Sequence, residues 1–202
     1  MNNTIDELYK NPDDKNIKKN FQFILFGGTG DLAHNKIIPA FYNLAAKNSL
    51  PDEFTIVATG RRYDNKNAYL DALYNSLINK KEKIDDKVWQ FLTDHIDYFQ
   101  LSFKDENDFK NLRKYLKNKS KKEKVANRIF YLATAPKFFA EIAKKIEKFN
   151  LLEIKLENNE SRLVIEKPFG HDFKSAKKLN DTLSSIFSEK NIFRIDHYLG
   201  KE

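Results

Sequence analysis

Three of the six glycines in this sequence lie within four positions, in the segment GGTGDLA that runs from Gly27 to Ala33. Gly27 and Gly30 have the spacing of the first two glycines of a dinucleotide-binding turn, where one permits a tight bend and the other lets the backbone approach a pyrophosphate. Ala33 stands at the third position, where a small residue lets a helix pack on a strand. A plain turn is the alternative. The pattern favours nucleotide binding because a buried strand is predicted before it and a helix after it.

Two arginines, Arg61 and Arg62, come directly after the next apolar segment, FTIVATG. NAD-binding domains place an acidic residue near this point, where it holds the ribose hydroxyls. Here two guanidinium groups would attract a 2′-phosphate, and the segment Thr59–Arg62 has no carboxylate to repel it. An exposed arginine pair on a loop is the alternative interpretation. The sequence therefore favours NADP as the cofactor, with NAD as a weaker alternative.

A lysine, Lys167, follows the apolar segment RLVIE and precedes Pro168. Because proline restricts the residue before it, Lys167 is expected to be extended, with its ammonium aimed at a defined point. An ordinary surface lysine is the alternative. Its place after a predicted strand favours a role in gripping an anion.

The end of the sequence, FRIDHYLGKE, carries polar groups that suit a phosphate. His197, Tyr198 and Lys201 offer an imidazole, a hydroxyl and an ammonium close together. Asp196 and His197 are neighbours, and neighbouring side chains on a strand point to opposite faces. Asp196 would therefore need an imidazole from elsewhere.

Six short apolar segments, which alternate with helical patterns, must position these groups. The first, FQFILF, is apolar at five of six positions, which fits a strand buried on both faces. The alternation predicts an α/β fold, a single domain with a doubly wound, mostly parallel, Rossmann-like sheet. Ligands of such sheets bind beyond the carboxyl ends of the strands. The predicted strands are 21–26, 54–60, 97–103, 128–134, 162–167 and a short one within 192–200 that runs into a turn or a new helix.

Apolar residues spaced by three and four predict the helices between these strands. The charged segment KNKSKKEK at 117–124 is predicted to be a solvated loop. As a nucleic-acid patch it is disfavoured, because no aromatic residue interleaves it. Three of the predicted buried stripes are Leu32, Ile37, Phe41, Leu44 and Ala45; Val88, Phe91 and Leu92; and Phe173, Ala176, Leu179, Leu183 and Phe187.

The composition narrows the classes of function. A net charge of +7 suits nucleic acid, an anionic membrane or a phosphorylated small molecule, and we predict the last of these. No apolar run reaches the roughly 18 residues that cross a bilayer, so no membrane partner is expected and a cytoplasmic location is predicted. The absence of cysteine excludes a disulfide scaffold, a thiolate zinc site and a cysteine nucleophile, and no metal site is predicted. His34, His95 and His171 are expected to be surface residues without chemistry.

Four blocks in order make the sequence resemble the glucose 6-phosphate dehydrogenase family, which catalyses the NADP-linked first step of the oxidative pentose phosphate pathway. They are FGGTGDLAHNKIIPAFYNL, RIFYLATAPKFFAEIAKKI, VIEKPFGHD and FRIDHYLGKE. The resemblance implies oxidation of glucose 6-phosphate to 6-phosphoglucono-lactone. Residues 1–20 are polar and are expected to form an N-terminal arm, and 21–202 the dinucleotide-binding domain.

The resemblance also implies roles for the matched positions. Asp196 and Lys167 would serve catalysis, and Lys167 would touch both cofactor and sugar. The substrate phosphate would meet His197, Tyr198 and Lys201, with Lys36 near the substrate. The cofactor diphosphate would contact Gly27, Gly28, Thr29, Gly30, Asp31, Leu32 and Ala33. Its 2′-phosphate would contact Thr29 and Arg61, and its adenine would contact Arg62. Ser102 and Phe103 would flank the cofactor more loosely, and Ala135, Pro136 and Lys167 would lie toward the nicotinamide.

Family members are more than twice as long as this sequence. By resemblance, the base is a histidine of a following β+α domain, which Asp196 would orient, and most of the homo-oligomer interface belongs to that domain. We therefore expect the 202 residues to bind NADP with little turnover. The alternative is an NADP-binding module that acts with a separate C-terminal chain.

Overall fold

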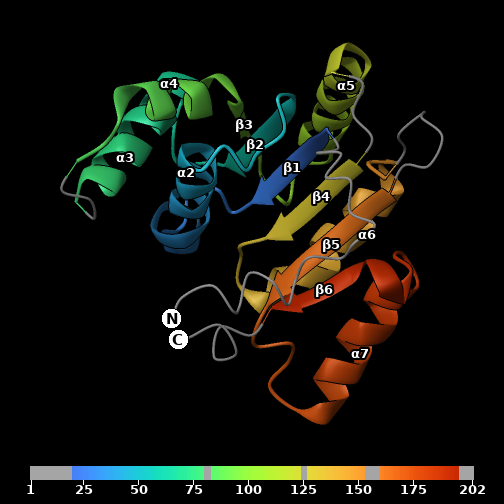
Figure 1. Ribbon diagram of the computed structural model, residues 1–202. Coiled ribbons are helices and arrows are strands. Elements are labelled where there is room, and N and C mark those ends of the chain that lie inside the picture. Colours follow the sequence, from blue (N-terminus) through green and yellow to red (C-terminus); the bar gives the residue numbers. More distant parts are fainter. Residues whose placement is uncertain (1–19, 80–82, 124–126, 153–159, 196–202) are drawn as a thin grey trace, which may run out of the picture.

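The computed structural model describes residues 20–79, 83–123, 127–152 and 160–195. Within them, six strands form one sheet in the order β3-β2-β1-β4-β5-β6, and every neighbouring pair is parallel (Figure 1). The predicted doubly wound fold is confirmed, and the sheet is wholly rather than mostly parallel. The strands are β1 (Phe21–Phe26), β2 (Phe54–Gly60), β3 (Ile96–Gln100), β4 (Asn127–Leu132), β5 (Glu160–Glu166) and β6 (Ile192–Ile195).

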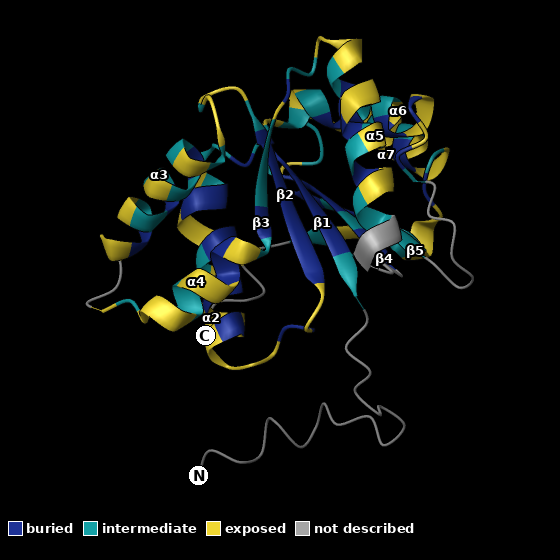
Figure 2. Cartoon of the chain, turned by 90° about the horizontal axis from the view of Figure 1, so that it is seen from above, coloured by how far each residue is buried: buried dark blue, intermediate teal, exposed yellow. Residues whose placement is uncertain are grey.

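Helices cover both faces of this sheet, as Figure 2 shows. One face carries the helical segment η1 (Ala33–Ile37) and α2 (Ile38–Ala46), with α3 (Lys66–Ile78) and α4 (Asp86–Asp94). The other carries α5 (Glu106–Glu123), α6 (Phe139–Lys148) and α7 (Phe173–Ser184). Two short 3₁₀ turns, η2 (Pro136–Phe138) and η3 (Glu189–Asn191), complete the described elements. Within the described residues, none of these helices is long and apolar enough to span a bilayer.

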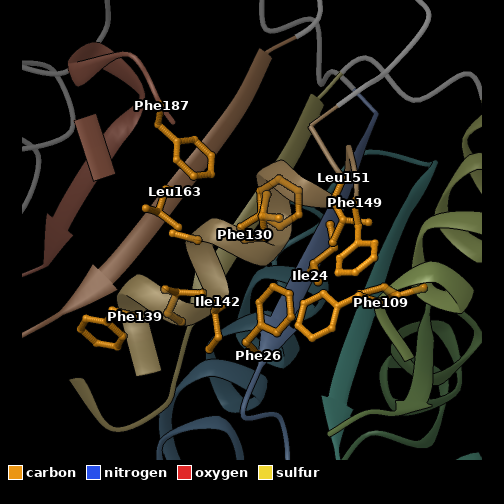
Figure 3. Packing of buried hydrophobic residues seen from close by; sticks show 14 of the residues in the cluster. Ile24, Phe26, Phe109, Phe130, Phe139, Ile142, Phe149, Leu151, Leu163 and Phe187 are labelled. Atoms are coloured by element: carbon orange, nitrogen blue, oxygen red, sulfur yellow. The ribbon is translucent and has the colours of Figure 1, made fainter. Parts of the chain in front are cut away.

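The central strand β1 feeds a hydrophobic core on each face. Ile24 and Phe26 point to the side of α5, α6 and α7, and Phe23 and Leu25 point to the side of α2, α3 and α4. In Figure 3, Phe26 lies beside Phe109, at a ring separation of 6.2 Å. The backbone groups of β1 pair with β2 and β4 along its length, and both of its faces are covered by the cores, so its ends are where the strand can approach a ligand.

The register of the strands brings three chain segments to one edge of the sheet. Phe26, the last residue of β1, is paired with Thr59 of β2 and with Leu132 of β4. The residues that follow these strands therefore meet at the carboxyl edge, at the point where the strand order reverses from β1 to β4.

Two sequence predictions about the elements are wrong. Residues 117–123 are not a loop, because α5 continues to Glu123, and residue 124 lies outside the described residues. The charged residues of this segment are helix formers, and Ser120 anchors them by a hydrogen bond to the Leu116 carbonyl (2.8 Å). The third strand ends at Gln100 rather than at residue 103, since the chain there turns back toward α5.

Three residues of the predicted apolar stripes are exposed. Phe173 is 84% exposed, because it is the first residue of α7 and lies beyond the packed part of that helix. Leu44 and Phe91 are also exposed. A spacing of three and four selects one face of a helix, but it does not say how far the neighbouring element reaches along that face.

A buried arginine holds the opposite, amino end of the sheet. Arg128 of β4 is only 2% exposed. Its Nε and Nη2 donate to the Gln22 Oε1 of β1 at 3.0 and 2.9 Å, and its Nη2 also donates to the Ser120 Oγ at 2.9 Å. Its Nη1 donates to the Leu151 carbonyl, which follows α6. Burial lowers the pKa of Arg128 to about 10, so the group stays charged at neutral pH.

We expect Arg128→Ala to lower the free energy of unfolding by about 3 kcal/mol, because it empties a buried position and removes the guanidinium donors from the Gln22 and Leu151 oxygens. Urea unfolding followed by circular dichroism measures the loss. The control is Arg162→Ala, which removes a half-exposed arginine paired with Glu160 at 2.7 Å and should cost about 0.5 kcal/mol or less. Equal losses for the two variants would contradict the structural role of Arg128.

Candidate dinucleotide-binding site

The turn after β1 is packed so tightly that two of its positions accept only glycine. Gly27 has φ +85°, and a Cβ there would lie 2.3 Å from the Ala133 carbonyl oxygen. A Cβ on Gly28 would lie 2.8 Å from the Cβ of Ala58 in β2. The turn thus sits between the ends of β2 and β4, with its backbone at the surface that a diphosphate would approach. Because Ala133 and Ala58 exclude side chains from Gly27 and Gly28, this part of the turn is bare backbone, which suits the close approach of a diphosphate.

Backbone hydrogen bonds hold the turn to the sheet and to the helix that follows. The Gly28 amide donates to the Thr59 carbonyl at 2.8 Å, and the Gly30 amide donates to the Gly27 carbonyl at 3.0 Å. The Gly30 carbonyl in turn accepts from the His34 amide at 3.1 Å. Ala33 is fully buried, as a small residue at the third glycine position should be. The positive end of the helical segment η1–α2 therefore faces the carboxyl edge, where it favours an anion.

The β2 side of the turn brings Thr29 close to the two arginines. A Cβ on Gly60 would lie 2.4 Å from the Thr29 Cγ2, so the threonine packs directly on the residue before Arg61. Arg61 and Arg62 are both exposed. The structure thus places Thr29 against the residue that precedes Arg61, and Asp31 and Leu32 follow Thr29 along the chain.

The β4 side of the turn contributes a hydroxyl that the sequence analysis does not single out. Thr134 lies against Gly27, whose Cβ would be 2.9 Å from the Thr134 Cγ2. The Thr134 Oγ1 is buried and has no hydrogen-bond partner within the described part of the chain. An orphaned hydroxyl beside a phosphate cradle suits a polar ligand. Its position at the end of the predicted strand 128–134, directly before Ala135 and Pro136, is the signal that could have identified it.

Ala135 and Pro136 continue from this edge, with Pro136 as the first residue of η2. Ala135 is exposed and Pro136 is half-buried, so both can approach a ligand. The prediction that they lie near the nicotinamide stays a prediction.

Ser102 and Phe103 lie beside β2, and contacts with other residues of the chain fix their positions. The amide of Leu101 donates to the Gly60 carbonyl at 2.8 Å, which places this segment next to the arginines. The Ser102 amide donates to the Asp108 Oδ2 at 2.7 Å, and the Phe103 ring packs against Phe138 with centroids 5.4 Å apart. The loose cofactor contact that we predict for Ser102 and Phe103 would therefore use the parts of these two residues that remain exposed.

The predicted residues near the substrate are placed only in part. Lys167 is exposed after β5, and its peptide bond to Pro168 is cis. The preceding Glu166 is buried and accepts a hydrogen bond from the Tyr131 hydroxyl. Lys36 is exposed on η1. Asp196, His197, Tyr198 and Lys201 lie outside the described residues.

The prediction that His34 is a surface residue is wrong. Its side chain is 9% exposed and lies between Tyr63 and Tyr69, with ring centroids at 6.2 and 5.8 Å. The Ser76 Oγ donates to the Ala72 carbonyl at 2.9 Å and lies 3.2 Å from the His34 Nδ1. Because the Ser76 hydroxyl proton is donated to the Ala72 carbonyl, Ser76 accepts a hydrogen bond from His34, and we assign the imidazole proton to Nδ1.

This assignment leaves the His34 Nε2 as a buried acceptor that has no partner among the described residues. Burial lowers the pKa of His34, and the charge of Arg62 lowers it further, while Asp31 opposes both. His34 shares a helical stripe with Ile37, Ile38 and Phe41, at spacings of three, four and seven. This position on the apolar face of the helix is the sequence feature that indicates burial of His34.

We expect the free energy of unfolding to fall as the pH drops below 6.5, the ordinary pKa of histidine, toward the lower value of folded His34. The reason is that the unfolded chain then binds a proton that the folded chain excludes. Urea unfolding from about pH 7.5 to about pH 5.5 measures this slope, and His34→Asn should flatten it.

The matched control for this pH series is His171→Asn, because His171 is fully accessible on the surface. It should keep the slope of the unaltered chain. A slope that survives His34→Asn unchanged would show that other groups cause it.

A doubly wound parallel sheet with a glycine turn at its switch point defines the class of dinucleotide-binding α/β domains. The family model described as "Glucose-6-phosphate dehydrogenase, NAD binding domain" matches residues 24–202. The chain therefore belongs to the glucose-6-phosphate dehydrogenase family of oxidoreductases, as its NAD(P)-binding domain, and the predicted resemblance is confirmed.

The relatives agree in sequence and in fold. Glucose-6-phosphate 1-dehydrogenase of Chlamydia muridarum is 35% identical over 184 residues, and that of Schizosaccharomyces pombe is 35% identical over 187. These alignments cover 89% and 92% of this chain but 36% and 37% of the relatives. The chain thus spans about 36% of the length of the first of these enzymes.

Two solved structures share the fold. "Glucose-6-phosphate dehydrogenase in complex with its substrate glucose-6-phosphate" superposes with a TM-score of 0.80 at 29% identity, over 92% of this chain and 38% of that one. The enzyme from Mycobacterium avium superposes with a TM-score of 0.74 at 30% identity, over 89% of this chain and 37% of that one.

Proposed function

We propose that this chain forms the NADP-binding part of an enzyme that oxidises glucose 6-phosphate to 6-phosphoglucono-lactone. The observation that carries the proposal is the cradle of Gly27 and Gly28, flanked by Thr29 and the exposed Arg61. The family supports the reaction, and the complex with glucose 6-phosphate of one solved relative supports the substrate. Residues 21–202 would form this domain, after the polar arm of 1–20.

The residues of the chain would bind the cofactor in three places. The segment from Gly27 to Ala33, at the start of η1, would hold the diphosphate, because the positive end of the helix dipole favours anions. The Gly28 and Gly30 amides would shape the turn rather than bind the ligand, since they donate to the Thr59 and Gly27 carbonyls. Thr29 and Arg61 would hold the 2′-phosphate, and Arg62 would lie over the adenine. Bound NADP would supply the acceptor for the hydride from the sugar C1.

On the substrate side, the chain would contribute cations and hydrogen-bond donors. Lys167 would lie between cofactor and sugar, with Lys36 on the same edge of the sheet. His197, Tyr198 and Lys201 would bind the sugar phosphate, for which a cation and neutral donors are suited. Asp196 would orient the imidazole that accepts the proton of the C1 hydroxyl.

We expect the 202-residue chain to bind NADPH, and Arg61→Ala to weaken NADPH binding about 10- to 100-fold while NADH binding changes less than about threefold. The reason is that only NADPH carries the 2′-phosphate that a guanidinium would bind. Cofactor fluorescence titration gives both dissociation constants.

Arg162→Ala is the control for this titration, because that arginine pairs with Glu160 at the amino end of β5. It should bind both cofactors as the unaltered chain does. Equal losses of NADPH and NADH in Arg61→Ala would contradict the 2′-phosphate role. Failure of the unaltered chain to bind NADPH at about millimolar concentration would contradict the proposed function.

A further inference from the structure

A cluster of three tyrosines lies behind the candidate cofactor site, where none of the predicted contacts requires it. Tyr69 comes from α3, Tyr98 from β3, and Tyr63 from the loop after Arg62. We propose that Tyr69 and Tyr98 are positioning residues that set the cofactor affinity and the preference for NADP. This inference rests on the proposed function, because it concerns the same site.

Tyr69 fixes the diphosphate turn. Its side chain is fully buried, and its hydroxyl donates to the Gly28 carbonyl at 3.0 Å. The Gly28 amide is held on its other side by the Thr59 carbonyl at 2.8 Å. Burial raises the pKa of Tyr69 far above its ordinary value, so the hydroxyl keeps its proton and stays a donor. Both polar groups of the Gly28 backbone are thereby fixed, and the turn is held in place before a ligand binds.

Tyr98 fixes the arginine loop. Its hydroxyl oxygen accepts a hydrogen bond from the Tyr63 amide at 3.3 Å. Burial raises the pKa of Tyr98, while the amides of Tyr63 and Arg62, which face its oxygen, lower it. The tyrosine therefore acts on the backbone of the loop and leaves the two guanidinium groups exposed at the surface.

The rings join these two anchors into one unit. Tyr69 stacks on Tyr98 with centroids 4.9 Å apart and an interplanar angle of 28°. Tyr63 contacts both rings, at 5.7 Å from Tyr69 and 6.0 Å from Tyr98. Such aromatic contacts restrict the relative movement of the segments that carry them. The diphosphate turn and the arginine loop are thus held at a fixed separation, which lowers the ordering cost of binding a ligand that spans both.

The two hydroxyls should differ in which cofactor they affect. Tyr69 acts on the turn that binds the diphosphate, a group that NAD and NADP share. Tyr98 acts on the loop of Arg61 and Arg62, which serves the 2′-phosphate of NADP alone. A tyrosine that only stabilised the fold would change neither the affinities nor their ratio.

The test uses Tyr69→Phe and Tyr98→Phe in the 202-residue chain, because phenylalanine keeps the ring and removes only the hydroxyl. We expect Tyr69→Phe to weaken NADPH and NADH alike, by about fivefold to tenfold. Tyr98→Phe should weaken NADPH by about fivefold and NADH by less than about twofold. Fluorescence titration measures the affinities, and thermal unfolding of each variant measures stability separately.

The matched control is Tyr115→Phe. This tyrosine of α5 also donates its hydroxyl to a residue of β3, Asp97, but from the opposite face of the sheet. This variant should lose stability and keep both affinities, which separates loss of a part-buried tyrosine hydrogen bond from loss of positioning.

Unchanged affinities in both variants, or an equal loss of NADPH and NADH in Tyr98→Phe, would overturn the inference while leaving the proposed function intact. Failure of the unaltered chain to bind either cofactor would overturn both. If Tyr69→Phe does not fold, the ratio of the NADPH and NADH affinities in Tyr98→Phe tests the inference by itself, since the Tyr98 ring is only half-buried.

Discussion

The close approach of three backbone segments at the end of β1 is the constraint on which the rest of the structure depends. The chain leaves β1 between the ends of β2 and β4, and there is no room for a side chain at Gly27 or Gly28. The Gly28 amide donates to the Thr59 carbonyl of β2, and the Ala133 amide donates to the Phe26 carbonyl of β1, each at 2.8 Å. The strand order reverses at the same place, so the tightest packing and the open edge for a ligand coincide.

The distribution of polar groups follows from burial of the sheet on both faces. Apolar side chains fill both cores, so charged and hydrogen-bonding groups are concentrated at the two ends of the strands. At the amino end, Arg128 donates its hydrogen bonds to acceptors inside the protein and stabilises the fold. At the carboxyl end, Arg61 and Arg62 stay exposed. The same residue type is buried and hydrogen-bonded at one end of the sheet and exposed at the other, because of what surrounds it.

Behind the candidate cofactor site lies a layer of aromatic side chains, which are His34, Tyr63, Tyr69 and Tyr98. These side chains are polar at one atom and aromatic elsewhere, so they fill a core and still hold backbone groups at defined points. Through these contacts the layer connects the glycine turn to the arginine loop. It also contains His34, a buried titratable group whose Nε2 has no partner within the described residues.

Local patterns in the amino-acid sequence were enough to predict the alternation of strands and helices, the glycine turn and the arginine pair, and four sequence blocks were enough to predict the family. The packed structure was needed to show that His34 is buried, that α5 extends to Glu123, that Phe173 is exposed, and that Tyr69 bonds to Gly28. That last bond joins residues 41 positions apart. Periodicity shows which face of a helix is apolar, but a contact between distant segments exists only once the crossovers pack and set their separation.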